Sequence, residues 1–312
     1  MKGTSGHIIS EQFEACIIAG AIGDAWGAAY ENDMPAKDDT TFYWGKKPTV
    51  SREWIITDDT QLTLATCEVL VTHSFDPALL AQKLLQVYKA AQLRGAGAST
   101  IKAMRDLDSG LHWRQAGRSG EFAAGNGAAM RIAPLAFFSS VSRANVRDAC
   151  MITHNNDEAY TGALAVFLVL REILTQKKSG SKDLLRKVIT ALPDTQVRDR
   201  LMEIAAKKNS TIQEIAGLYG TNGYVVNSVP FAIFSGLQAM NMGLAEVLEQ
   251  VISCGGDTDT NASIAGQIGG ALLGPEKIPG HLKNRLADLP EYGQIIDTIK
   301  KVTTRLESQP GF

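Results

Sequence analysis

Apolar residues recur at three- and four-residue intervals along almost the whole chain. This spacing places them on one face of a helix. No stretch alternates polar and apolar residues for long enough to predict a sheet, although Tyr224–Val226 is compatible with an extended segment. The pattern therefore predicts an all-α protein. Its expected helices are Glu11–Tyr30, Thr60–Thr72, Pro77–Arg94, Ala144–Met151, Asp157–Thr175, Lys182–Ala191, Val197–Lys207, Thr211–Leu218, Val229–Met240, Gly243–Ser253, Asn261–Leu273 and Pro279–Lys301.

Two of these helices have one face made of very small residues. The faces consist of Gly20, Gly23 and Gly27 in the first helix and of Ala262, Gly266, Gly269 and Gly270 in the late one. A glycine inside a helix costs about 0.5–1 kcal/mol relative to alanine, so several of them indicate close approach of two backbones. We expect the two helices to pack near the centre of the molecule. Their ends would then bring Asp24 and Glu31 towards the acidic segments described next.

Two segments place acids at the start of an apolar helix. Asp58 and Asp59 lie between threonines, and Asp257 and Asp259 follow a pair of glycines. Carboxylate and hydroxyl oxygens suit Mg²⁺, Mn²⁺ or Ca²⁺ rather than zinc. The alternative is helix capping, because Asp58 with Gln61 fits a capping box.

The number of acids favours a metal over capping. One cap needs one acceptor, and each segment offers more. If the segments meet, two bare carboxylates about 4 Å apart repel by roughly 4 kcal/mol at an effective dielectric constant near 20. A divalent cation would turn this penalty into binding energy, so we expect one shared metal centre.

Composition excludes several classes of protein. The chain has 312 residues, a formal net charge of −2 and 21% charged residues, so no basic face indicates nucleic acid. The longest apolar stretch, Ala163–Leu170, is too short to cross a membrane, and the N-terminus does not read as a signal peptide. Four scattered cysteines favour a reducing cytoplasm. Cys254, beside an acidic turn, is a possible nucleophile, but a small buried thiol is the commoner role.

Five motifs in order resemble the ADP-ribosylglycohydrolase family. They are Gly23-Asp24-Ala25-Trp26-Gly27 with Glu31, Thr57-Asp58-Asp59-Thr60, Gly125-Asn126-Gly127-Ala128-Ala129-Met130-Arg131, Thr153-His154, and Gly256-Asp257-Thr258-Asp259-Thr260-Asn261. The resemblance extends from about Phe13 to Leu273. It implies one compact orthogonal bundle of helices over residues 1–312, with a core at about 13–273 and a C-terminal helix packed on it.

The resemblance also implies a metal site at the base of an ADP-ribose cleft. The site would hold two Mg²⁺ ions, for which Mn²⁺ can substitute. Its ligands would be Thr57, Asp58 and Asp59 on one side and Asp257, Asp259 and Thr260 on the other. Either Asp58 or Glu31 would be the catalytic base, with Asp58 preferred. Glu31 could instead be a surface acid at the end of its helix.

The same resemblance assigns residues to the ligand. Gly125, Asn126, Gly127 and Met130 would belong to a loop around the diphosphate and the adjacent ribose, since glycines let backbone N–H groups approach phosphate. Arg131 would either contact phosphate or make structural pairs. His154 would line the cleft or be structural, and Tyr224 would stack near the adenosine. The long glycine-rich segment Leu111–Asn126 that precedes the loop is typical of a functional loop.

The expected reaction is removal of ADP-ribose from a modified protein, most plausibly from arginine. Serine-linked ADP-ribose and O-acetyl-ADP-ribose stay open as substrates. So does an immunity or binding protein that neutralises an ADP-ribosylating toxin or transferase. A metal phosphoesterase would leave the Gly125–Arg131 loop unexplained. Ala123 and Ala124 stand where some relatives have an acid or aromatic residue, so Glu121, Glu31 and Asp33 all remain candidates for guanidinium recognition.

Overall fold

The computed structural model describes residues 3–31, 48–72, 74–175, 181–207 and 209–308. The regular secondary structure of this part of the chain is almost entirely helical, as the apolar spacing predicts. Its α-helices are α1 (Gly3–Ala28), α2 (Asp58–Thr72), α3 (Pro77–Lys89), α4 (Ala98–Asp108), α5 (Trp113–Ala116), α6 (Arg143–Met151), α7 (Asp157–Thr175), α8 (Ser181–Ala191), α9 (Gln196–Ala206), α10 (Ile212–Tyr219), α11 (Val225–Leu237), α12 (Ala239–Met242), α13 (Leu244–Ser253), α14 (Thr258–Leu273), α15 (Gly280–Ala287) and α16 (Tyr292–Ser308). Shorter 3₁₀ turns are η2 (Glu121–Ala123), η3 (Ala133–Phe137) and η4 (Pro275–Lys277). The strands β1 (Arg118–Ser119) and β2 (His154–Asn155) pair in parallel.

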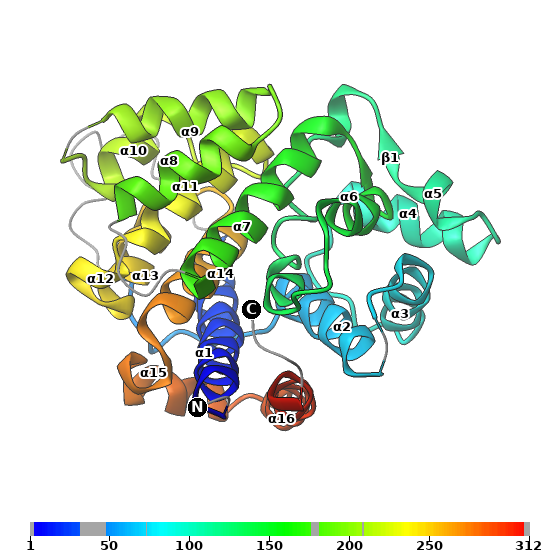
Figure 1. The fold of residues 1–312 in the computed structure, drawn as a ribbon, viewed down its shortest axis with the longest axis horizontal. Helices are drawn as coiled ribbons and strands as arrows, with labels where there is room; N and C mark the ends of the chain where they lie inside the picture. Colours follow the sequence, from blue (N-terminus) through cyan, green and yellow to red (C-terminus); the bar gives the residue numbers. More distant parts are fainter. Residues whose placement is uncertain (1–2, 32–47, 73, 176–180, 208, 309–312) are drawn as a thin grey trace.

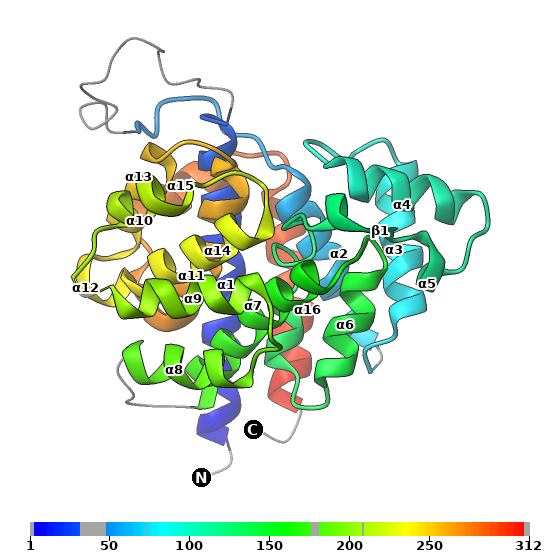
Figure 2. The ribbon, with the colours of Figure 1, turned by 90° about the horizontal axis from the view of Figure 1, so that it is seen from above.

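The helices α1 and α14 lie side by side at the centre (Figure 1). The helices from α2 to α6 lie on one side of this pair, and those from α8 to α13 lie on the other, with α7 between the two groups. The view from above shows the same division (Figure 2). The helix α16 packs against α1 and α2. It does so through Ile295, Ile299, Val302 and Leu306, whose spacing gives the helix one buried apolar face.

The contact between α1 and α14 has almost no room for side chains. A Cβ atom on Gly23 would lie 2.1 Å from the carbonyl oxygen of Ala262, and one on Gly266 would lie 2.3 Å from the carbonyl oxygen of Ala19. The expectation that glycines mark a close central contact is therefore confirmed. A backbone approach this close fixes the rotation of both helices, and with it the direction of the polar residues at their ends.

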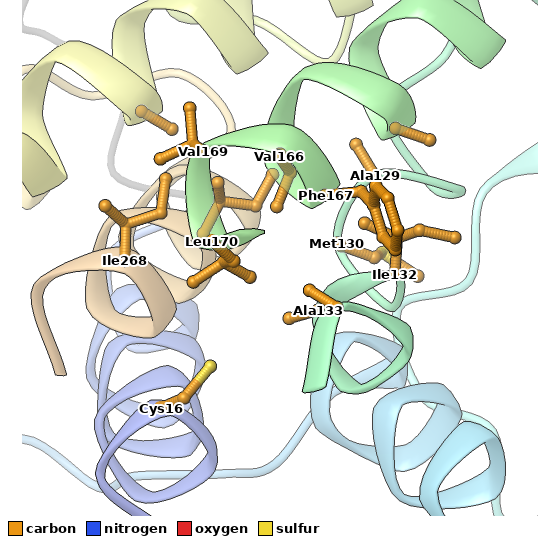
Figure 3. Packing of buried hydrophobic residues seen from close by; sticks show 14 of the residues in the cluster. Cys16, Ala129, Met130, Ile132, Ala133, Val166, Phe167, Val169, Leu170 and Ile268 are labelled. Atoms are coloured by element: carbon orange, nitrogen blue, oxygen red, sulfur yellow. The ribbon is translucent and has the colours of Figure 1, made fainter. Parts of the chain in front are cut away.

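One apolar cluster fills the space around this pair and includes residues from Ile9 to Leu306. Figure 3 shows Met130, Ile132 and Ala133 packed between α7 and the helices beneath it. The segment that follows the Gly125–Gly127 motif is thus anchored in the core. This anchoring holds the preceding glycine loop in a defined place.

Several helix boundaries differ from the expected ones. The single helix expected over Pro279–Lys301 is two helices, because Pro290 lies in the turn between α15 and α16 and cannot donate a helical hydrogen bond. The helix expected from Val229 begins at Val225, so Val225 and Val226 are helical rather than extended. Only Tyr224 has extended character, in an isolated bridge with Gly125.

Two helices were not expected at all. The helix α4 follows the small residues 95–97, and the short α5 lies inside the glycine-rich Leu111–Asn126 segment. The four residues of α5 are too few to show an apolar period, whereas α4 does have apolar residues at three-residue spacing, Ile101, Met104 and Leu107. Both helices are supported by packing, α4 on α3 and α5 on α6.

No helix in the described ranges is long and apolar enough to cross a membrane. All four cysteines are free thiols. Burial raises the pKa of the Cys254 thiol to about 12, and its sulfur lies 3.1 Å from the carbonyl oxygen of Gln250. The thiol is therefore protonated near neutral pH, which favours the structural role over the nucleophilic one.

We predict that Gly23→Ala destabilises the protein although alanine is the better helix former. The added Cβ meets the backbone of α14, and overpacking of this kind costs about 1–3 kcal/mol. Gly217→Ala is the matched control, because Gly217 is helical and a Cβ there meets nothing within 4 Å. The control should be neutral or gain about 0.4–1 kcal/mol. Urea unfolding followed by circular dichroism measures both, and equal stability of the two variants would contradict the close-contact interpretation.

Candidate metal and ligand site

Asp24 organises the start of α2 from the neighbouring helix α1. Its carboxylate accepts hydrogen bonds from the hydroxyl groups of Thr57 at 2.6 Å and Thr60 at 2.5 Å. It also accepts bonds from the backbone N–H groups of both threonines, at 3.2 and 3.1 Å. Burial raises the pKa of Asp24 to about 6, against the lowering effect of these four donors. The side chain is fully buried, so Asp24 caps α2 across the interface between two helices.

Among the acids that begin α2 and α14, Asp259 accepts a hydrogen bond from the backbone N–H of Thr260 at 2.8 Å, in the first turn of its own helix. Gln61, the expected partner of Asp58 in a capping box, instead bonds to the backbone of Gln92 and Arg94. Asp257 makes no capping bond to α14, and its carboxylate accepts a hydrogen bond from the side-chain amide of Asn126 at 2.7 Å. The capping box expected for Asp58 and Gln61 is therefore not formed. In the second pair Asp257 is not a cap, whereas Asp259 does accept from the backbone N–H of Thr260.

The two acidic segments meet, as expected. Thr260 donates from its hydroxyl to Asp59 at 3.0 Å, which joins the start of α14 to the start of α2. Ligand atoms of Asp24, Asp59 and Asp259 lie within 4.8 Å of one another. The same holds for a second group, formed by Glu31, Asp257 and Asp259. Five carboxyl groups from three separate parts of the chain thus converge, and Asp259 belongs to both groups.

This convergence raises the pKa of several carboxyl groups. Burial, and then the charges of Asp24 and Asp257, raise the pKa of Asp58 to about 8. Burial, and then the charges of neighbouring acids, raise the pKa of Asp59 and of Asp259 well above the ordinary value of an aspartate. One oxygen of Asp59, Oδ1, is buried without a hydrogen-bond partner among the residues described. An unpaired anionic oxygen among other acids is a position that a cation would stabilise.

A cleft of about 520 Å³ opens above these acids. Its lining comprises Glu31, Asp58, Gly95, Gly97, Ala98, Ser99, Thr100, Arg118, Gly125, Asn126, Gly127, Met130, His154, Asn222, Gly223, Gly256, Asp257, Asp259 and Thr260. The acids and the expected ligand loop therefore border the same space. Glu31 is exposed and lines this cleft, so it is not a surface acid far from the other carboxyl groups.

The glycine loop is held by three helices. The N–H of Asn126 donates to Gly223, and the N–H of Val225 donates to Ala124, so the loop pairs with the start of α11. The carbonyl of Met130 accepts hydrogen bonds from Gln267 of α14 at 2.8 Å and Thr63 of α2 at 3.3 Å. The loop is therefore fastened to both helices that carry the acids.

Other expected site residues have different positions. Arg131 is only 2% exposed, and its guanidinium donates to backbone and hydroxyl oxygens beneath the loop, which favours the structural role. Tyr224 is 37% exposed at the start of α11, outside the lining of the cleft. Glu121 is exposed on η2 and does not line the cleft either. Asp33 lies outside the described residues.

The sequence did not point to Gly95–Thr100, which forms a further wall of the cleft. Gly95 has φ +76°, and a Cβ there would lie 3.5 Å from the Asp58 carboxylate. The helix α4 begins after Gly97, and no side chain caps it. The first backbone N–H groups of α4 therefore make no hydrogen bond to a capping side chain. The sequence feature that could have identified this wall is the pair Gly95 and Gly97 followed by Ser99 and Thr100. The same feature is also typical of an ordinary loop.

Comparisons with known proteins show the family of this chain. A model of the ADP-ribosylglycohydrolase family matches residues 6–310, and the chain belongs to that family. It is thus a hydrolase of the ADP-ribosylglycohydrolase class. It is 29% identical to ADP-ribosylhydrolase ARH3 from Danio rerio, over 86% of this chain and 84% of that protein.

Two further relatives extend the comparison. The chain is 26% identical to an ADP-ribosylarginine hydrolase from Pseudomonas putida, over 89% of this chain and 74% of that protein. A solved structure described as an ADP-ribosylglycohydrolase-related protein complex has the same fold, with a TM-score of 0.71 and 24% identity. The match covers 96% of this chain and 99% of that one.

We predict that the metal-free protein loses stability as pH rises. A carboxyl group whose pKa is higher in the folded than in the unfolded protein favours folding while it is protonated. That contribution is complete below the ordinary value of 3.8 and is lost as pH rises through the folded values, about 6 for Asp24 and about 8 for Asp58. The melting temperature in EDTA should therefore fall between about pH 4 and pH 8. Asp58→Asn should flatten this dependence, and a melting temperature that rises steadily over the same range would contradict it.

Proposed function

We propose that the protein is a Mg²⁺-dependent hydrolase that releases ADP-ribose from modified protein side chains, with ADP-ribosylarginine as its main substrate. The observation that supports this proposal best is the meeting of unneutralised acids and a glycine loop at one cleft. Family membership alone supports hydrolysis of ADP-ribose, and the particular metal and linkage are the further step.

The donor set fits two hard divalent cations. Asp58, Asp59, Asp257 and Asp259, with the hydroxyl oxygens of Thr57 and Thr260, would hold them, and the unpaired Oδ1 of Asp59 is the clearest vacant donor. Mn²⁺ offers similar chemistry and would substitute. The bound ions would neutralise the acids and polarise the ribose and the attacking water.

The residues of the chain would share the remaining work. The glycine loop and the start of α4 would bind the diphosphate through backbone N–H groups. Among the carboxylates that line the cleft, Glu31 is the one outside the Thr57–Thr60 and Gly256–Asn261 motifs, although its ligand atom lies within 4.8 Å of those of Asp257 and Asp259. We therefore assign to Glu31, rather than to Asp58, the role of taking the proton of water, while Asp58 would hold metal. Partial burial, and then the charge of Asp257, raise the pKa of Glu31, which brings it closer to the range of an effective base.

Arginine is preferred as the linkage for two reasons. A guanidinium is cationic, and the cleft wall near Glu31 and Asp257 is acidic. One relative is also named for ADP-ribosylarginine hydrolysis. The physiological partner would be an ADP-ribosylated protein, modified by a toxin or a transferase whose effect this enzyme reverses.

We expect release of free ADP-ribose from an arginine-linked peptide with Mg²⁺, and no release in EDTA. Serine-linked and O-acetyl substrates should be cleaved at least about tenfold more slowly, a difference of 1.4 kcal/mol in barrier. Chromatography of the released ADP-ribose measures all three. Faster cleavage of a serine-linked peptide would overturn the choice of linkage, and full activity after exhaustive metal removal would overturn the metal.

Substitutions of single acids test which of them are needed for turnover. Asp257→Asn should abolish turnover with the helical spectrum unchanged, whereas Asp288→Asn, an exposed acid at the end of α15, should leave turnover as it was. Glu31→Gln should lower kcat and leave binding of Mn²⁺ nearly intact. Loss of metal binding in Glu31→Gln would assign this side chain to the metal instead.

We predict that Asn126→Ala weakens both metal and ligand binding. Its amide holds the Asp257 carboxylate at 2.7 Å, and a hydrogen bond to a charged group contributes about 1.5–3 kcal/mol. Calorimetric titrations of Mg²⁺ without ligand, and of ADP-ribose with saturating Mg²⁺, separate the two effects. Asn241→Ala, on the distant α12, is the control. Unchanged Mg²⁺ affinity in Asn126→Ala would show that the contact does not position Asp257.

A further inference from the structure

Three polar side chains form a chain of hydrogen bonds beneath the glycine loop. The guanidinium of Arg131 donates to the hydroxyl of Thr153 at 2.8 Å, and that hydroxyl lies 2.8 Å from Nδ1 of His154. All three are buried, with exposed fractions of 2% for Arg131, 0% for Thr153 and 4% for His154. Arg131 also donates to the carbonyls of Gly127 and Ala149, so its position is fixed from several sides.

This arrangement determines where the proton of the imidazole lies. The hydroxyl of Thr153 accepts from Arg131, which is always a donor. Its own hydrogen then needs an acceptor, because a buried donor left unpaired is costly. Among the described residues, Nδ1 of His154 is the acceptor within reach. If Nδ1 accepts, a neutral ring must carry its proton on Nε2.

The protonated nitrogen faces the ligand loop. A Cβ on Gly125 would lie 3.1 Å from Nε2 of His154, and one on Gly127 would lie 2.9 Å from the neighbouring Cε1. His154 itself lines the cleft. The two glycines therefore leave open the space into which an Nε2–H group would donate.

We propose that Arg131 and Thr153 are positioning residues, which lock His154 as the Nε2–H tautomer and so present a neutral hydrogen-bond donor to a phosphate oxygen of the ligand. The choice of phosphate rests on the proposed function. It is supported by the other donors on this wall, the hydroxyls of Ser99 and Thr100 and the N–H groups of the loop. Arg131 thus acts on the ligand through two other side chains rather than by direct contact.

The environment keeps this donor neutral. Burial, and then the charges of Arg131 and Arg118, lower the pKa of His154 to about 3. The ring therefore does not gain a second proton near neutral pH. Its single N–H must be directed by hydrogen bonding, since an unconstrained imidazole exchanges between two tautomers.

The first test is spectroscopic and uses the free protein. Two-bond ¹⁵N–¹H correlation spectra of ¹⁵N-histidine-labelled protein distinguish a protonated from an unprotonated ring nitrogen, and His154→Gln identifies the signal to follow. We expect protonated Nε2 and unprotonated Nδ1 in the wild type. A protonated Nδ1 would refute the inference, whether or not the protein binds ADP-ribose.

The second test removes the hydroxyl of Thr153, which links Arg131 to His154. Thr153→Val has nearly the same shape without the hydroxyl, Thr153→Ser keeps the hydroxyl, and Thr161→Val is the control for loss of a buried threonine hydroxyl elsewhere. In Thr153→Val we expect the single tautomer to be lost, and ADP-ribose affinity to fall about tenfold, as for an unpaired buried group. KM should rise while kcat stays near the wild-type value. Thr153→Ser and Thr161→Val should keep the tautomer and the affinity.

Several outcomes would contradict the proposal that Arg131 and Thr153 fix the tautomer of His154. A single Nε2–H tautomer in Thr153→Val would show that something else selects it. Equal losses of affinity in Thr153→Ser, which keeps the hydroxyl, and in Thr153→Val, which lacks it, would mean that the packing of this side chain rather than its hydroxyl is what matters. If Thr153→Val does not fold, the wild-type spectrum and Thr153→Ser still decide the question. A wild-type protein with the expected tautomer and no affinity for ADP-ribose would refute both the proposed function and the phosphate acceptor, and would leave the tautomer assignment standing.

Discussion

The site depends on the backbone-to-backbone contact between α1 and α14. Because glycines let these helices touch, Asp24 near the C-terminal end of α1 reaches the first turn of α2, and Glu31 beyond that end reaches the first turn of α14. A larger side chain at the contact would separate the helices and move these acids apart. The helical glycines lower local helix stability in order to make a precise polar site possible.

The second constraint is electrostatic. Carboxyl groups from α1, α2 and α14 are gathered in a buried place. Among the residues that the structure describes, none of them has a basic partner in direct contact, and Arg131 acts on Asp58 only at a distance. Such a group either holds protons or holds cations. In the metal-free protein, burial and mutual repulsion raise the pKa values of these carboxyl groups. The site is therefore partly protonated near neutral pH. Metal binding would therefore release protons, so affinity and pH are linked through the same acids.

The sequence indicated which acids meet at the site, but it did not indicate all the segments that line the cleft. Asp58, Asp59, Asp257 and Asp259 were evident because paired acids at helix starts exceed what capping needs. Gly95–Thr100 was not, because alanine and glycine carry no period and no charge. The role of Arg131 could not be decided either. An arginine that contacts phosphate and one that supports a loop have the same sequence signature, and only its burial and its oxygen partners separate them.

The Gly125–Arg131 loop and the acids are connected by hydrogen bonds, so they form one unit rather than two adjacent sites. Asn126 bonds to Asp257, and the Met130 carbonyl is bonded to α2 and α14 together. Any shift that separates α2 from α14 must strain or break those bonds. A cation between the two helices and a ligand on the loop would therefore favour the same arrangement. Thermodynamic linkage requires that each then strengthens the binding of the other, with no need for a moving lid.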